Sequence, residues 1–146
     1  MPAQMFVNLP VKNLDKSIEF FTRHGYQFNP QFIDENATCM IVGDNIFVML
    51  LVEKFFQTFT KKAICDASKS TEVLVSLSCD SRAAVDEQVR KAVAAGATTP
   101  QAPQDHGWMY DHGFEDLDGH NWGLFYMDMS AMPQRQEKAE TGPLRK

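Results

Sequence analysis

The sequence has few basic residues, few cysteines and no long apolar run. Lysine and arginine number 14 against 19 aspartate and glutamate residues, which gives a net charge of −5. No basic run could neutralise a series of phosphates, so we expect no nucleic-acid partner. The longest apolar stretch, 46–52, is too short to cross a bilayer, and 1–10 has neither a basic leader nor a long apolar core. We therefore expect no membrane association and a cytoplasmic protein.

Cysteine is also scarce. Cys39, Cys65 and Cys79 are odd in number and share no short spacing. This argues against a disulfide framework and against a structural zinc site. We expect reduced thiols, with Cys79 at an apolar position that faces the helix and therefore inert, and with Cys65 exposed. No histidine lies beside Cys65 in the sequence, so a nucleophilic role has little support.

The composition is otherwise that of a globular domain, and the first half of the chain predicts one strand, one helix and three more strands. Of the 146 residues, 44% are hydrophobic and 23% are charged. Residues 5–11 alternate as in a strand, and Asn13 can cap a helix that ends at Gly25. His24 would place a favourable charge at the end of this helix. Three apolar runs separated by turn residues then predict an antiparallel meander over 26–33, 37–42 and 46–52.

The second half repeats this order after a polar connector. Residues 72–79 alternate as a strand, Ser81 can cap a helix that ends at Gly96, and further strands are predicted near 97–102, 109–115 and 121–127. Gly25 and Gly96 are separated by nearly half the chain, as are Val11 and Cys79, which indicates an internal duplication.

We therefore predict an α+β fold made of two tandem βαβββ modules. The modules should span about 4–53 and 71–128, within a single domain at 1–128, and 129–146 should be a flexible tail. Two curved sheets should surround a cleft, with the helices on the outside, and a ligand should bind in that cleft.

Two segments resemble the vicinal-oxygen-chelate superfamily, which includes glyoxalase I, bleomycin-resistance proteins, fosfomycin-resistance enzymes and extradiol dioxygenases. The opening run from Leu9 to Phe21 is similar to the first strand and helix of that family. The closing run from Phe114 to Trp122 resembles its last hairpin, although Leu117 stands where the family commonly has proline. The resemblance covers about 5–128.

The resemblance implies a divalent metal held by His, Gln or Glu on the first and last strands of each module. The corresponding positions here are Phe6, Leu74, Gly123, and either Met49 or Leu51. None of these side chains can ligate a hard metal ion. We therefore expect no metal and no cofactor, so the Lewis acid of the related enzymes would be missing.

The same resemblance predicts a pocket that is mostly apolar, with a few polar groups to orient a ligand. Its walls would be Phe6, Asn8, Leu74, Ser76, Ser78, Asn121, Gly123 and Phe125, and Trp108 and Tyr110 could cover it as a lid. The leading hypothesis is a binding protein for a small, partly apolar molecule, with no catalytic residue identified. Phe6 and Leu74 could instead complete a core without any pocket.

Two other functions stay open. A displaced cluster of His112, His120 and Glu115, or Asp111 in place of Glu115, could hold a metal or supply a general base in a lyase, isomerase or dioxygenase-type enzyme. The alternation of strand residues and the turn character of this region argue against it. The second alternative is a regulatory or structural dimer with a filled cleft. Members of the family commonly pair, so we expect a homodimer by analogy.

Overall fold

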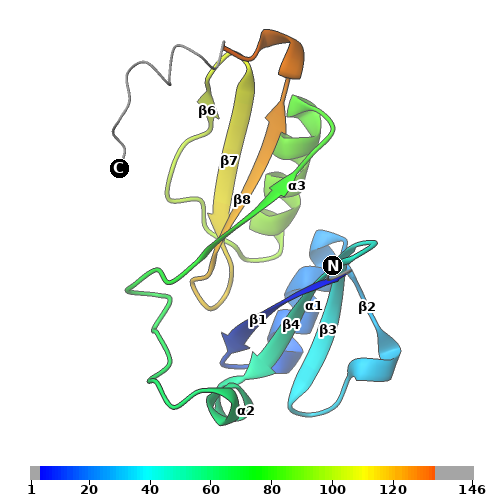
Figure 1. The fold of residues 1–146 in the computed structure, drawn as a ribbon, viewed down its shortest axis with the longest axis vertical. Helices are drawn as coiled ribbons and strands as arrows, with labels where there is room; N and C mark the ends of the chain where they lie inside the picture. The colour runs from blue at the N-terminus through cyan, green and yellow to red at the C-terminus, as the bar shows by residue number, and fades with distance from the viewer. Residues whose placement is uncertain (1–3, 134–146) are drawn as a thin grey trace.

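The computed structural model describes residues 4–133, which form two modules with the same order of elements (Figure 1). The first module contains β1 (Met5–Val11), α1 (Leu14–His24), β2 (Gln27–Phe28), β3 (Ala37–Gly43) and β4 (Ile46–Val52). The second contains β5 (Leu74–Ser78), α3 (Arg82–Ala94), β6 (Gln104–Asp105), β7 (Met109–Glu115) and β8 (Asn121–Met127). The remaining helical turns are η1 (Pro30–Phe32), α2 (Glu53–Phe56), η2 (Gln57–Phe59) and η3 (Met129–Ala131). The predicted α+β class and the two βαβββ modules are confirmed.

Each module forms one four-stranded sheet. The strand orders are β1-β4-β3-β2 and β5-β8-β7-β6, with the first strand of each module parallel to the last and the other pairs antiparallel. Both long helices begin as predicted, because the side chains of Asn13 and Ser81 accept hydrogen bonds from Lys16 N and Ala84 N. Gly25 ends α1 in the left-handed region, at φ 114°.

One apolar core joins the two modules. Helix α1 packs against α3, and the aromatic side chains of α1 reach the second sheet. The ring of Phe21 lies 5.3 Å from that of Trp122, and Phe20 lies 6.2 Å from Phe114. Trp122 and Leu124 are buried, because alternation along β8 turns both toward the core. This shared core supports the proposal that the two modules make a single domain.

Two predicted strands are shorter or displaced, and proline explains both differences. The run at 26–33 pairs only over β2, because Pro30 starts the turn η1 and Asn29 caps it. The strand predicted near 97–102 is reduced to an isolated bridge between Thr98 and Glu115, and the paired strand is β6. Pro100 and Pro103 lie between these two pairings and have no N–H to donate to a sheet.

The prediction for His24 is wrong. Its side chain is buried, and Nε2–H donates to the carbonyl of Gln88 on α3 at 2.8 Å. Burial lowers the pKa of His24, and the nearby charge of Lys91 lowers it further. The ring is therefore a neutral part of the contact between the modules, because α3 covers this end of α1.

Further expectations concern the thiols, membranes and the tail. The three cysteines, all within the described range, form no disulfide, and Cys65 is the exposed one. Among residues 4–133, no helix combines the length and apolarity needed to cross a bilayer. The tail predicted at 129–146 begins with the turn η3, and its part at 134–146 lies outside the described residues.

Candidate functional site

The open faces of the two sheets, which point away from the helices, carry most of the predicted ligand positions. On the first sheet, Phe6 stacks on Phe47 of β4 with ring centroids 4.8 Å apart, and Asn8 is exposed on the same face. On the second sheet, the pairing of β5 with β8 sets Leu74, Ser76 and Ser78 beside Asn121, Gly123 and Phe125. Alternation along the strands therefore placed these residues correctly on one face of each sheet.

The open face of the second sheet is hollowed into a groove of about 550 Å³. We call this hollow the sheet groove. Five predicted positions line it, together with side chains from β7 and the end of β8: Leu74, Ser76, Asn121, Gly123, Phe125, Met109, Asp111, His112 and Met127. Its floor lacks side chains where Gly113 pairs with Gly123. A Cβ at Gly113 would lie 2.8 Å from the carbonyl oxygen of Trp122, so this close backbone approach requires glycine.

The other predicted positions do not share this groove. Asn8 lines a second cavity of about 330 Å³, between β1, the linker after η2 and the start of β8. Asn121 borders both hollows and donates to Thr71 Oγ1 at 3.2 Å. Ser78 borders a third cavity, and Phe6 borders none of the three. Within residues 4–133 of one chain, the two open sheet faces thus do not close into a single cleft. The predicted residues of each sheet lie together on its open face. Those of the two sheets form two separate half-sites in one chain.

Tyr110 is not placed as a lid over the open face. Its hydroxyl donates to Asp86 on α3 at 2.6 Å, and the guanidinium of Arg82 lies over its ring at 5.4 Å. Alternation along β7 puts Tyr110 on the same side as the core residue Phe114. Trp108 precedes β7 and is half-buried, with its carbonyl accepting from Asp128 N at 2.7 Å. Through its hydrogen bond to Asp86, Tyr110 therefore connects α3 to the second sheet.

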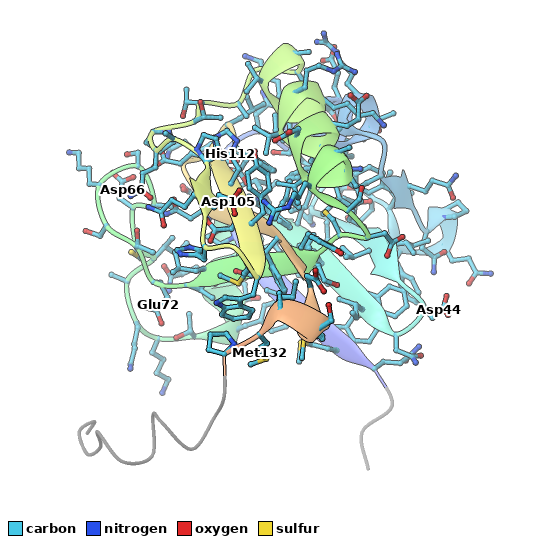
Figure 2. The ribbon with its side chains drawn as sticks, turned by 90° about the horizontal axis from the view of Figure 1, so that it is seen from above. Asp44, Asp66, Glu72, Asp105, His112 and Met132 are labelled. Atoms are coloured by element: carbon cyan, nitrogen blue, oxygen red, sulfur yellow. The ribbon has the colours of Figure 1, made fainter. Side chains whose placement is uncertain are left out.

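The displaced metal cluster is not formed among residues 4–133. Nε2–H of His112 donates to the carbonyl of Gln101 at 3.1 Å, whereas Nε2–H of His120 donates to the carbonyl of Pro10 at 2.7 Å. The two rings are thus directed to different parts of the molecule, with His112 on β7 (Figure 2). Across the described chain, no three His, Cys, Asp or Glu side chains are placed to share a metal ion.

The turn between β7 and β8 joins the two modules. Buried Asp116 accepts from the backbone N–H groups of Asp118 and His120 and from Trp122 Nε1 at 2.9 Å. Burial raises the pKa of Asp116, in spite of these hydrogen bonds. Asp118 in turn accepts from the backbone of Lys12 at 2.8 Å. The sequence indicated only an ordinary turn here, because no short-range pattern shows that a turn residue will contact the other module.

The divalent metal of related enzymes does not fit the donors present. Phe6 is stacked on Phe47, Leu51 is buried, and Leu74 is an exposed hydrocarbon side chain. Gly123 has no side chain, and a Cβ there would meet Ser76 Oγ at 3.1 Å. Carbon-only positions supply no nitrogen or oxygen ligand for such a metal.

Comparison with known proteins agrees with this architecture. The family described as "Bleomycin resistance protein-like N-terminal" matches residues 4–43. A hypothetical protein, SA1046 from S. aureus, is 30% identical, with a TM-score of 0.73 over 86% of this chain and 95% of that one. A glyoxalase/bleomycin resistance protein/dioxygenase family enzyme from Burkholderia phytofirmans PsJN is 18% identical, with a TM-score of 0.70 over 84% and 96%. A bleomycin resistance determinant encoded on transposon Tn5 is 20% identical, with a TM-score of 0.62 over 86% and 98%. No curated protein matches the sequence.

Proposed function

Because the chain belongs to the vicinal-oxygen-chelate superfamily of glyoxalase, bleomycin-resistance and dioxygenase-like proteins, we propose that it binds a small, partly apolar molecule in the sheet groove without a metal ion. The observation that carries this proposal is the groove itself, which has apolar walls and a floor of paired glycines. Apolar hollows with a few polar groups are the usual form of small-molecule sites.

The groove favours a flat ring with some polar substituents. Leu74 is 69% exposed and Met127 is 38% exposed, so both can lose water-accessible apolar surface when a ligand binds. The gap above Gly113 and Gly123 accepts a planar group, while Phe125 can pack against its edge or face. Ser76 and Asn121 supply the hydroxyl and amide that would orient it.

We further propose that the protein acts as a homodimer. The open face of the first sheet leaves Phe6 48% exposed, and the sheet groove is also uncovered in one chain. A second copy that sets its Phe6–Phe47 face opposite this groove would cover both apolar surfaces. Light scattering should then give twice the chain mass. Phe6→Glu should give monomers and weaker ligand binding, whereas Val93→Glu on the exposed side of α3 should do neither.

Ligand binding is tested with two named probes, metal-free bleomycin and the fluorescent dye anilinonaphthalene sulfonate. We expect saturable binding of at least one probe, detected by calorimetry or by fluorescence, and no effect of a metal chelator. Gly123→Leu fills the groove and should weaken binding about tenfold or more. The matched control is Gly43→Leu at the end of β3, where a Cβ meets only ordinary contacts with Ile46 at 3.7 Å.

Three results would contradict the proposal. Stoichiometric metal in untagged protein, with binding that a chelator abolishes, would show that other donors hold an ion. Equal binding by Gly123→Leu and wild type would place the ligand outside the groove. Failure of both probes to bind, with a stable dimer, would favour the structural alternative with a filled cleft.

A further inference from the structure

The linker between η2 and β5 encloses a cavity that the proposed function does not use. This cavity of about 330 Å³, here called the linker cavity, lies between β1, the linker and the start of β8. The linker is the loop that joins the two modules in Figure 1. Among the described residues, Asn121 is the one that borders both this cavity and the sheet groove. The linker cavity has the size of a small-molecule site and is a separate hollow.

Cys65 places a thiol on the wall of the linker cavity. Its Sγ–H donates to the carbonyl of Ser70 at 3.6 Å, and both residues border the cavity. Cys65 is the exposed cysteine, whereas Cys39 is buried and Cys79 is half-buried. The thiol can therefore react with a molecule that enters this cavity.

His120 gives the same cavity a hydrogen-bond acceptor. The side chain is 9% exposed, and its Nε2–H donates to the carbonyl of Pro10 at 2.7 Å. In the neutral ring, Nδ1 is then a lone-pair acceptor, and no described residue donates to it. Within the described chain, the unpaired side-chain atoms sealed from solvent are His24 Nδ1 and Thr38 Oγ1, so His120 Nδ1 keeps accessible surface. Of the three cavities, His120 borders the linker cavity alone, so a ligand there can reach Nδ1.

The remaining walls favour a neutral, partly apolar ligand. Lys62 and Glu72 both border the cavity, so the formal charges of its walls cancel. A ligand with a net charge of either sign would meet a like charge as well as an opposite one. Phe56 and Ile64 supply apolar surface, and Asn8 supplies an amide that can donate to a carbonyl oxygen.

We propose that the linker cavity binds an α,β-unsaturated amide and that Cys65 then forms a covalent bond to it. The amide N–H would donate to His120 Nδ1, its carbonyl would accept from Asn8, and its hydrocarbon part would pack on Phe56. The sulfur of Cys65 bonds to the β-carbon, the carbon–carbon π bond breaks, and the α-carbon gains the proton that the thiol loses. No group leaves, and no oxidant or reductant takes part.

The test uses two acrylamides that differ in one group. N-Phenylacrylamide has the N–H donor, and N-methyl-N-phenylacrylamide lacks it. Intact mass follows the addition to the full-length protein, peptide mapping identifies the modified cysteine, and each rate is divided by the rate with glutathione. We expect modification of Cys65 at a rate that saturates with the concentration of N-phenylacrylamide. Half-saturation by the N-methyl compound should need about tenfold more or should not be reached.

Three variants locate the site. His120→Gln can still donate to the Pro10 carbonyl but has no acceptor at the position of Nδ1, so it should lose the preference for the compound with the N–H. Ala63→Phe puts a larger side chain on the cavity wall and should slow the modification about tenfold. Ala83→Phe is the matched control, because Ala83 is exposed on α3 and borders none of the three cavities. It should react as wild type does.

The proposal is overturned if the rate rises in proportion to concentration without saturation, because Cys65 would then be an exposed thiol with no binding site. Equal half-saturation by the two compounds on the wild-type protein, or a wild-type rate in Ala63→Phe, would also overturn it. Gly123→Leu separates this proposal from the function proposed for the sheet groove. That variant should lose binding in the groove and keep the modification of Cys65, and loss of both would place the amide in the groove instead.

Discussion

The two modules each have a turn between their last two strands, yet only one of these turns contacts the other module. In the first module, Asp44 and Asn45 are exposed, and the carbonyl of Asn45 accepts from Met5 N at 2.8 Å within the same module. Asp44 projects at the edge of the molecule (Figure 2). In the second module, Asp116 and His120 are buried, and His120 donates to Pro10 of the first module.

The difference shows how one turn of a duplicated unit can acquire a separate structural role. The β3–β4 turn needs only to reverse the chain, and its residues Asp44 and Asn45 are exposed. The β7–β8 turn lies against β1 and the linker, so its polar groups must be satisfied by protein atoms. Two of the acidic and histidine residues that could suggest a metal centre, Asp118 and His120, are used as hydrogen-bond partners between modules. Four predictions test this comparison.

The largest effect is expected for Asp116→Ala. This change leaves Trp122 Nε1 and the N–H groups of Asp118 and His120 without their acceptor in a buried turn. We expect a loss of about 3 kcal/mol in the free energy of unfolding, measured by urea denaturation. Asp44→Ala in the other turn should cost less than about 0.5 kcal/mol. Similar losses for the two variants would contradict the distinction between the turns.

Glycine substitution probes the backbone of the same two turns. Gly119 has φ 91°, and a Cβ there would lie 2.8 Å from the carbonyl carbon of Ala67 in the linker. Gly119→Ala should therefore cost about 2 kcal/mol in thermal or urea unfolding. Gly43→Ala should be nearly neutral, since its Cβ would meet Ile46 at 3.7 Å. If Gly119→Ala were as stable as Gly43→Ala, the linker would not be packed on this turn.

The pH dependence tests the other contact between the modules, at His24. Its folded pKa is lowered by burial from the ordinary 6.5, so the unfolded chain binds the proton more readily. The contribution of neutral His24 to the free energy of unfolding is complete above about pH 6.5. It is lost as the pH falls toward the pKa of the folded protein, by at most about 1.4 kcal/mol per pH unit. The raised pKa of Asp116 has the opposite sign, because its contribution falls as the pH rises above the ordinary 3.8.

Urea unfolding between about pH 7.5 and about pH 5.5 separates these two groups. His24→Gln should flatten the loss of stability in this range. His106→Gln, on an exposed loop, should leave it as in wild type. A slope that His24→Gln does not change would assign the pH dependence to another group.

The smallest effect is expected for Asp118→Ala. This carboxylate accepts from the backbone of Lys12 at 2.8 Å, but the contact is partly open to solvent. We expect a loss of about 1 kcal/mol, read from urea unfolding. Asp118→Asn should recover most of it, because the amide oxygen can still accept the Lys12 N–H. If Asp118→Ala cost nothing, the hydrogen bonding of this turn to the first module would rest on His120 alone.

Periodicity was enough to predict most of the elements. The strands at 109–115 and 121–127 and the cap residues Asn13 and Ser81 agree with the structure, because hydrophobic alternation and helix capping act over a few residues. The failures at 26–33 and 97–102 arose where proline interrupts an otherwise apolar or extended run. For the candidate site, the open-face residues were predicted from alternation, whereas Tyr110 was misplaced because its partner Asp86 lies on another element.

The sequence by itself determined the repeated βαβββ order, which residues share a sheet face, and the absence of hard metal donors at Phe6, Leu74 and Gly123. These properties depend on residue type and local spacing. Only the tertiary structure decided that the helices meet at the junction of the modules, that His24 is neutral and that Asp118 and His120 join the two halves. Such contacts connect residues far apart in the chain, and burial then sets their charge and their hydrogen-bond partners.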